Sequence, residues 1–294
     1  MGRAACHESV NHNAALIVTM FVNFTRPHAE FSPMTDSILY SLAANGVATL
    51  TLNRPELHNA IDDALIARLS ELLDEVEANP DVRVLVLTGN GLSFSSGVDQ
   101  DWMRRMQGYS EAEHLADAQA LTRVLHKLDT LRLPTIASVQ GSAFGVGAGL
   151  VACCDVAVAT AEALFGFSEV RLGLIPASTA PYVVRAIGER PARRYFITAE
   201  RFNAEKAKRL GLVHIVVEHE ALNAQVTYLT ETLVRNGPHA IAGSKALLRD
   251  VWGKVIDQRL VDFTAERIAH ARASDEGREG VAALLEKRKP NWQA

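Results

Sequence analysis

The chain has few cysteines and no spacing that would hold a metal. Its 294 residues include three cysteines, Cys6, Cys153 and Cys154, and no second pair of cysteines or histidines stands at zinc-ligand spacing. An odd number of cysteines, two of them adjacent in an apolar segment, indicates reduced thiols in a cytoplasmic protein. The sequence therefore predicts neither a disulfide framework nor a structural zinc site.

Positive charge and long apolar runs are also scarce. The net charge is −4, so no basic surface is expected that would attract nucleic acid or an anionic membrane. The apolar run at 14–24 is too short to span a bilayer, and no small-residue signal cleavage site follows it. Because regular patterning begins just after Met34, we interpret residues 1–33 as a disordered extension or the product of an upstream start codon.

What remains is ordinary globular composition, with 48% hydrophobic and 22% charged residues. From Met34 onward, predicted strands alternate with predicted helices, which favours an α/β core over 34–218. Asn45-Gly46 predicts the turn of a hairpin. A helical region over 219–294 follows, with a break expected near Gly237-Pro238. The other expected helices cover 62–80, 113–131, 180–188 and 190–198, and the other expected strands cover 82–90, 135–140, 154–160 and 212–217.

Residues 141–149 contain four glycines between a predicted strand and a predicted helix. A helix that begins after such a turn offers unpaired N–H groups to negative charge. A phosphate-binding P-loop is excluded because the segment has no lysine, and the spacing G-x-G-x-G differs from the dinucleotide fingerprint. A helix packed through small residues, with no chemical role, remains the alternative.

A second glycine turn has the same layout, with a strand, a polar turn and a helix start at 97–99. Two such turns can each direct a backbone N–H group at one oxygen, which is how an oxyanion hole is built. Glu169 lies between apolar residues, where desolvation would raise its pKa toward a value useful for proton transfer. A carboxylate in such a loop also fits a helix cap or an ion-pair partner.

Six stretches of the chain, in order and spacing, resemble the crotonase superfamily of enoyl-CoA hydratases and isomerases. Within it, the chain is most similar to bacterial methylglutaconyl-CoA hydratases, with hydratases of isoprenoid glutaconyl-CoA thioesters as the alternative. The resemblance implies a spiral of ββα units forming two nearly perpendicular sheets, and a C-terminal helical region that builds a homotrimer or a hexamer. The stretches are LTLNRPELHNAI, VLVLTGNGLSFSSGVDQDWM, PTIASVQGSAFGVGAGLVACCDVAVAT, FGFSEVRLGLIPA, ITAERFNAEKAKRLGLVHIVV and REGVAALLEKRKPNW.

The resemblance also implies a site. The thioester oxygen of an acyl-CoA substrate would be held by the N–H groups of Val98 and Val146, and Glu169 would act as acid and base. No metal or redox cofactor is implied, because coenzyme A is part of the substrate. The residues that the resemblance assigns to coenzyme A and substrate binding are His58, Ala60, Val98, Asp99, Gln100 and Asp101.

Four positions depart from the family pattern. Gly149 stands where many hydratases carry a second glutamate, which leaves Glu169 as the single acid/base, and we expect a gap there that admits a branched or carboxylated acyl group. Val98 and Val146 replace alanine and glycine, so the donors stay unstrained only if neither valine has a positive φ. Glu56 replaces a lysine that lies near the coenzyme A phosphates in relatives.

Three other functions were considered. A crotonase-fold isomerase would move a proton between carbons, and a non-catalytic paralogue would be consistent with the two valines. RNA binding, which one relative performs through a lysine-rich helix, is disfavoured because residues 62–79 have six acidic side chains against one arginine. Three segments also have simpler explanations: His58 as a solvent-facing turn residue, 102–106 as core packing and 286–290 as a solvated basic face.

Overall fold

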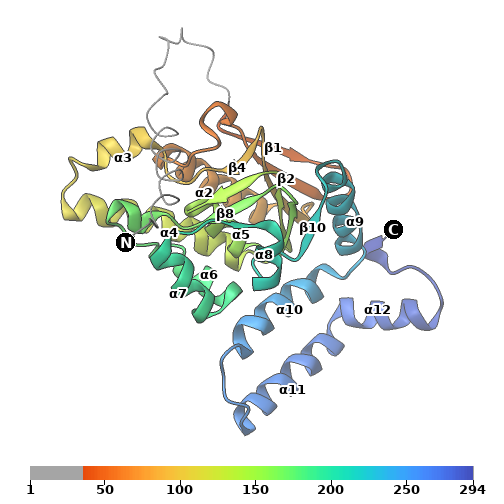
Figure 1. Cartoon of the computed structure of the whole chain (residues 1–294). Helices are drawn as coiled ribbons and strands as arrows, with labels where there is room; N and C mark the ends of the chain where they lie inside the picture. The colour runs from red at the N-terminus through yellow and green to blue at the C-terminus, as the bar shows by residue number, and fades with distance from the viewer. Residues whose placement is uncertain (1–35, 294) are drawn as a thin grey trace, which may run out of the picture. The chain divides into compact units, whose positions relative to one another are not determined.

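The computed structural model describes residues 36–293 (Figure 1), so the predicted extension at 1–33 lies outside the described residues. Its larger sheet has six strands in the order β1-β2-β3-β5-β7-β10. Strands β1 and β2 form the predicted antiparallel hairpin, and every other neighbouring pair is parallel. The strands are β1 (Ile38–Leu42), β2 (Val47–Leu52), β3 (Val84–Gly89), β5 (Thr135–Val139), β7 (Val156–Thr160) and β10 (Ile215–Val217).

Helices cover both faces of this sheet. On one face, α2 (Asp63–Ala78) and α4 (Glu111–Thr130) pack on each other and contribute leucines to the main core. On the other face, α9 (Leu222–Val234) packs against a separate apolar cluster that includes Val84, Ile136 and Val158. Burial on both sides explains why β3 is an almost continuous apolar run in the sequence and why every residue of β5 is buried.

A second sheet has four short strands in the order β4-β6-β8-β9. The resemblance implied a second sheet, but the residue patterns predicted none of its strands, so the two predicted strand, turn and helix segments need correction. Strand β6 lies between the glycine turn at Gly141 and the helix α5 (Val146–Cys153), and the second glycine turn contains β4, after which α3 (Gln100–Met106) begins. The strands are β4 (Ser93–Ser95), β6 (Ser142–Phe144), β8 (Leu164–Gly166) and β9 (Phe202–Asn203).

Shorter helices complete the α/β part. The helix α5 is buried along almost its whole length, as its small residues predicted. The predicted pair at 180–188 and 190–198 is confirmed as α6 (Ala180–Ile187) and α7 (Glu189–Thr198), and α8 (Ala204–Leu210) follows β9. The short 3-10 helices are η1 (Pro55–Leu57), η2 (Glu169–Leu172), η3 (His219–Ala221) and η4 (Asn291–Gln293).

The C-terminal segment contains α10 (Pro238–Val251), α11 (Gln258–Ala273) and α12 (Asp275–Leu285) (Figure 1). The predicted break at Gly237-Pro238 is confirmed, and further breaks separate α10 from α11 and α11 from α12. Lys245 of α10 is buried and anchors this segment, because its Nζ lies 2.6 Å from Asp155 Oδ2 and donates to Leu133 O at 2.7 Å. In the described chain, no helix is long and apolar enough to cross a membrane.

Candidate active site

Three adjacent parallel strands, β4, β6 and β8, end at the same edge of the smaller sheet. Ser95 of β4 pairs with Ala143 of β6, and Phe144 of β6 pairs with Gly166 of β8. Parallel neighbours direct the chain segments that follow them to the same edge of the sheet. Those segments carry Val98 after β4, Val146 after β6 and Glu169 after β8. The structure therefore brings together the three residues that the sequence singled out.

The two candidate donors are backbone N–H groups with unstrained geometry. Ile61 N donates to Gly97 O at 2.8 Å and Asp99 N donates to Ile61 O at 2.9 Å, so the N–H and C=O groups of Val98 itself, which lie on the opposite sides of these two peptide groups, point away from Ile61. Val146 is the first residue of α5, where an N–H group has no partner within the helix. Neither N–H group donates to another residue of the described chain.

The preceding glycines take the positive φ values. Gly97 has φ +95° and Gly145 has φ +51°, whereas Val98 and Val146 are not among the residues with positive φ. A β-branched residue would be strained in that region of the backbone map, and glycine is not. Neither valine has a positive φ, so both candidate donors keep an unstrained backbone, as the sequence required.

Close contact between the two turns explains the density of glycine. A Cβ atom added to Gly97 would lie 3.1 Å from Phe144 O, and one added to Gly147 would lie 2.8 Å from the Cβ of Ser95. Side chains at these positions would push the two turns apart. The glycines thus permit a close backbone approach between the two turns.

The carboxyl group of Glu169 lies beside the start of α5. A Cβ added to Gly145 would lie 3.1 Å from Glu169 Oε1, and Glu169 Oε2 is buried without a hydrogen-bond partner in the described chain. Burial raises the pKa of the Glu169 carboxyl, and a hydrogen bond with its own backbone opposes that shift. This is the direction that the sequence predicted, and a carboxyl with a raised pKa is suited to accepting and returning protons.

The space beside Gly149 is filled. A Cβ added to Gly149 would lie 2.3 Å from Thr179 Cγ2, and Thr179 is buried with its Oγ1 donating to Pro176 O at 3.2 Å. The expected gap at Gly149 is therefore wrong on this side, because a threonine methyl group occupies it. A glutamate side chain does not fit at position 149 while Thr179 is present.

The two segments that the resemblance assigned to coenzyme A binding lie side by side. Ser96 N donates to His58 O at 2.9 Å, and Ser95 Oγ donates to Asn59 O at 2.9 Å. His58 is exposed, has φ +51° and bonds through Nδ1 to Ser93 Oγ at 3.1 Å. Of the other assigned residues, Gln100 is exposed, Asp101 is half-buried, and Ala60 and Asp99 are buried.

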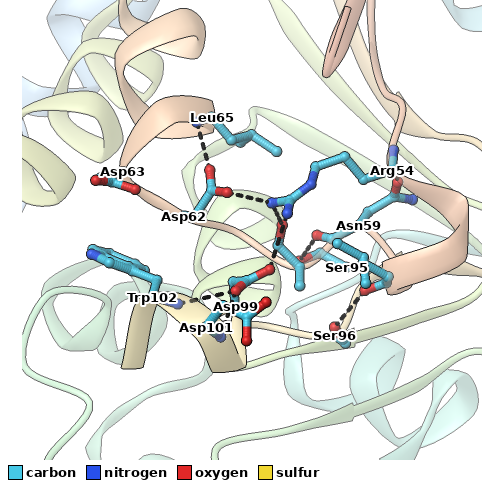
Figure 2. Close-up of polar contacts among 12 residues, drawn as sticks. Arg54, Asn59, Asp62, Asp63, Leu65, Ser95, Ser96, Asp99, Asp101 and Trp102 are labelled. Atoms are coloured by element: carbon cyan, nitrogen blue, oxygen red, sulfur yellow. Dashed lines mark hydrogen bonds and ion pairs between the residues drawn. The ribbon is translucent and has the colours of Figure 1, made fainter. Parts of the chain in front are cut away.

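Thr179 and a set of polar residues that joins these segments were not predicted from the sequence. Arg54 pairs with Asp62 and Asp99, and Asn59 bonds to the backbone of three other residues (Figure 2). Arg54 and Asn59 lie within the stretch LTLNRPELHNAI, so their motif was noticed but not their role. An aspartate just before a predicted helix is an N-cap signal, which points to Asp62.

The remaining candidates have structural roles or are exposed. Trp102 is 2% exposed and packs in the core, which favours core packing for that residue of 102–106. Glu56 lies on the surface. Arg288, in the basic segment at 286–290, pairs with Glu279 and Glu286. Within residues 36–293, no group of three or more histidine, cysteine or acidic residues could hold a metal ion.

Comparison with known proteins agrees with this geometry. The model of the enoyl-CoA hydratase/isomerase family matches residues 43–294. The chain belongs to that family. It is 34% identical to a putative enoyl-CoA hydratase of Thermus thermophilus over 248 residues, which cover 84% of this chain and 97% of the relative. It is 32% identical to the crotonyl-CoA hydratase of Syntrophomonas wolfei, with 84% and 94% covered.

Solved structures in the family have the same fold. A putative enoyl-CoA hydratase/isomerase (crotonase) of Legionella pneumophila matches with a TM-score of 0.83 and 45% identity, covering 87% of this chain and 98% of that one. An enoyl-CoA hydratase of Shewanella pealeana matches with a TM-score of 0.85 and 43% identity, covering 87% and 96%. The predicted crotonase-like α/β fold with a C-terminal helical region is therefore confirmed.

Proposed function

We propose that this protein is an enoyl-CoA hydratase that adds water across the 2,3 double bond of an acyl-CoA thioester. One observation carries the proposal: three adjacent strands present two unpaired N–H groups and one half-buried carboxyl group at the same sheet edge. This is the set of groups that hydration of an enoyl thioester needs. The names of the family and of the relatives from Thermus thermophilus and Syntrophomonas wolfei support the same reaction class.

The chemistry follows from polarisation of the thioester. The N–H groups of Val98 and Val146 donate to the thioester oxygen and stabilise the enolate that forms there. Glu169 accepts a proton from water as the water oxygen bonds to the β carbon, and the electron pair of the double bond moves into the enolate. The same carboxyl group then returns a proton to the α carbon. Every transferred proton passes through Glu169, because Gly149 supplies no second carboxylate.

The acyl group is proposed from resemblance. The segment 149–202 is most similar to bacterial methylglutaconyl-CoA hydratases, so we infer a branched or carboxylated enoyl group such as methylglutaconyl, with an isoprenoid glutaconyl group as the alternative. His58, Ala60 and the segment 98–101 are proposed to bind the coenzyme A part, and no metal or redox cofactor takes part. The proposed setting is leucine degradation in the cytoplasm.

An absorbance assay across short, branched and carboxylated enoyl-CoA thioesters tests the proposal. We expect loss of the enoyl absorbance with at least one thioester and a Glu169→Gln variant whose kcat is lower by about 10²–10⁴-fold or more. Binding of the thioester should persist in that variant, because both N–H donors are backbone groups. A variant that retains more than about a tenth of the kcat contradicts the role of Glu169, since that loss is smaller than general acid–base catalysis supplies.

A crotonase-fold isomerase is the second candidate, and the single carboxylate is the observation that favours it. One carboxyl group can take a proton from one carbon and return it to another without adding water. Incubation in ¹⁸O-labelled water followed by mass analysis separates the two reactions, because only hydration adds the mass of water to the product.

We also propose that the protein assembles as a homotrimer or as a hexamer of two trimers. The C-terminal helices expose more large apolar side chains than isolated helices in water usually do. The exposed apolar residues of this segment are Leu248, Trp252, Val255, Ile256, Val261, Ile268, Val281, Leu284 and Leu285.

A further inference from the structure

The side chain of Arg54 lies between Asp62 and Asp99 (Figure 2), and Asp99 directly follows the candidate donor Val98 in the chain. Arg54 Nη1 lies 2.8 Å from Asp62 Oδ2, and Arg54 Nη2 lies 3.0 Å from Asp99 Oδ2. The side chains of Arg54 and Asp99 are 17% and 8% exposed, so the pair is largely shielded from solvent. Arg54 Nη1 also donates to Ala60 O at 2.8 Å.

Each aspartate also caps a helix. Asp62 Oδ1 accepts from Leu65 N at 2.8 Å at the start of α2. Asp99 Oδ1 accepts from Asp101 N at 2.8 Å and from Trp102 N at 3.1 Å at the start of α3. Each carboxylate therefore uses one oxygen for a helix and the other for the guanidinium group. The guanidinium group of Arg54 therefore fixes the starts of α2 and α3 relative to each other.

Val98 lies between residues that this network holds. Its successor Asp99 is fixed by side chain and backbone, and its predecessor Gly97 accepts from Ile61 N at 2.8 Å and donates to Ser95 Oγ at 3.2 Å. Asn59 holds the facing loop, since its Oδ1 accepts from Arg54 N at 2.9 Å and its Nδ2 donates to Ser93 O at 2.8 Å. The direction of the Val98 N–H group is therefore set by a network that begins at Arg54.

We propose that Arg54, acting through Asp99, is a positioning residue that aims the Val98 N–H group at the substrate thioester oxygen. This inference rests on the proposed function, because it assigns Val98 as an oxyanion donor. A buried ion pair with a purely structural role would change stability alone, whereas this role also changes how strongly the bound carbonyl is polarised.

The test measures that polarisation directly. Crotonyl-CoA carrying ¹³C at the thioester carbon is bound to protein in which Glu169→Gln slows turnover, and the carbonyl stretching frequency is recorded by infrared difference spectroscopy. In this parent, the frequency should lie below that of free crotonyl-CoA. In Asp99→Asn made on the parent, one oxygen cannot serve both the helix start and Arg54, so the frequency should move back toward the free value.

Activity is measured with Glu169 intact. Asp99→Asn should lower kcat by about 10²-fold, the size expected for a small misplacement of a catalytic group, with a much smaller change in KM. Arg54→Lys keeps the positive charge but cannot contact both aspartates. Its carbonyl frequency, measured on the Glu169→Gln parent, and its kcat, measured with Glu169 intact, should lie between the values without this change and those of Asp99→Asn. It also serves as the test variant if Asp99→Asn does not fold.

The matched control is Asp129→Asn. Asp129 of α4 pairs with Arg185 of α6 by two contacts, and neither residue belongs to the Arg54 network, so this control also removes one carboxylate from an arginine pair. It should leave the carbonyl frequency and kcat unchanged. The inference is overturned if the folded test variant has the parent carbonyl frequency at saturating ligand. If the parent itself shows no shift from the free ligand, the proposed oxyanion hole fails instead.

Discussion

At the scale of single residues, the contact between Gly149 and Thr179 defines how many carboxylates the candidate site has. The methyl group of Thr179 lies where a side chain at 149 would begin, at 2.3 Å from an added Cβ. Atoms at that distance overlap, so one of the two positions must be small. The substitution of a family glutamate by glycine is thus matched by a second residue that closes the space.

Gly149→Ala should destabilise the protein although alanine is the better helix former. The added methyl group overpacks against Thr179 at a cost of about 1–3 kcal/mol, which offsets the gain of about 1 kcal/mol in helix propensity. Thr179→Ser removes the overlapping methyl group and keeps the hydroxyl that donates to Pro176 O. The double variant should therefore be more stable than the sum of the two single effects predicts.

Urea denaturation of the two single variants and the double variant measures this coupling. Residues in direct contact typically show interaction energies of about 0.5–3 kcal/mol. Additive effects within error would contradict the contact, because they would mean that the helix shifts to accommodate the extra methyl group.

The raised pKa of Glu169 has a consequence for stability. Its cause is burial, which favours the protonated form in the folded state above the ordinary value of 4.5. The folded state then binds more protons than the unfolded state, so stability falls as pH rises from about 4.5 through the raised pKa. Glu169→Gln carries no titratable group and escapes this loss.

Melting temperatures of the wild type and Glu169→Gln, compared between pH 4 and pH 8, test this effect. The variant should gain stability relative to the wild type as pH rises through that window. The activity should show the opposite preference, because the wild type needs an ionised carboxylate to accept a proton and should lose kcat/KM as pH falls below the raised pKa. A difference in melting temperature that does not change with pH would contradict the burial of this carboxyl group.

At the scale of secondary-structure elements, the longer helices and strands were predicted from the sequence and the shortest strands were not. The helices α2 and α4 and the strands β3 and β5 have many residues that repeat one pattern, and all were predicted. The strands of the smaller sheet have two or three residues each, too few for an alternating pattern to appear. They form because the longer elements bring them together, which is tertiary information.

The same limit applies to the candidate site. Glu169 was singled out because it lies between apolar residues, and the two glycine turns because each joins a strand to a helix, whereas Val98 and Val146 were named as donors only by the resemblance. Thr179 lies in a loop with no motif of its own, and its partner is thirty positions away. The contacts of Arg54 also join distant segments, so its role depends on folding that the local sequence does not describe.

The last helix offers a test at this scale. Truncation after Gly277 removes most of α12, together with Trp292, whose Nε1 donates to Arg235 O at 3.1 Å and whose carbonyl accepts from Arg83 Nη1. The side chains of Val281, Leu284 and Leu285 are 57%, 77% and 77% exposed. Three large apolar side chains exposed on one short helix indicate a surface that another protein subunit covers. We expect the truncated protein to be monomeric or aggregated, and inactive.

Size-exclusion chromatography with light scattering, combined with the enoyl-CoA assay, measures both properties. Val281→Ala serves as a milder variant that keeps the helix and removes one apolar contact. A truncated protein with full activity and an unchanged number of subunits per particle would contradict the proposed role of this helix in assembly.

At the scale of the whole molecule, the C-terminal segment is tied to the α/β part through buried charge. Asp155 directly follows α5 and its loop, and its Oδ2 accepts from Thr135 N at 2.8 Å as well as pairing with Lys245. Lys245 is buried and Asp155 is exposed, so removal of the Asp155 carboxylate would leave the buried charge of Lys245 without its partner, which is destabilising. The segment that is proposed to build the oligomer is thus attached at the far end of the helix that begins with Val146.

Deletion of residues 1–33 should leave the stability and the activity of the protein unchanged. The family match begins at residue 43 and the described elements begin with β1 at Ile38, so the matched region and every described element lie outside the deleted segment. The melting temperature and the hydration rate should be nearly unchanged when the two forms are compared in the same buffer. A large fall in either quantity would mean that this segment contributes to folding or to the site.

The contact between Gly149 and Thr179 also constrains how the molecule can change over evolutionary time. A lineage that gains a glutamate at position 149 must first replace Thr179 with a smaller residue, since the reverse order passes through a protein with overlapping atoms. The intermediate with two small residues has a cavity, which costs stability but leaves Glu169 in place. Substitutions along such a path are therefore ordered, with the change at 179 preceding the change at 149.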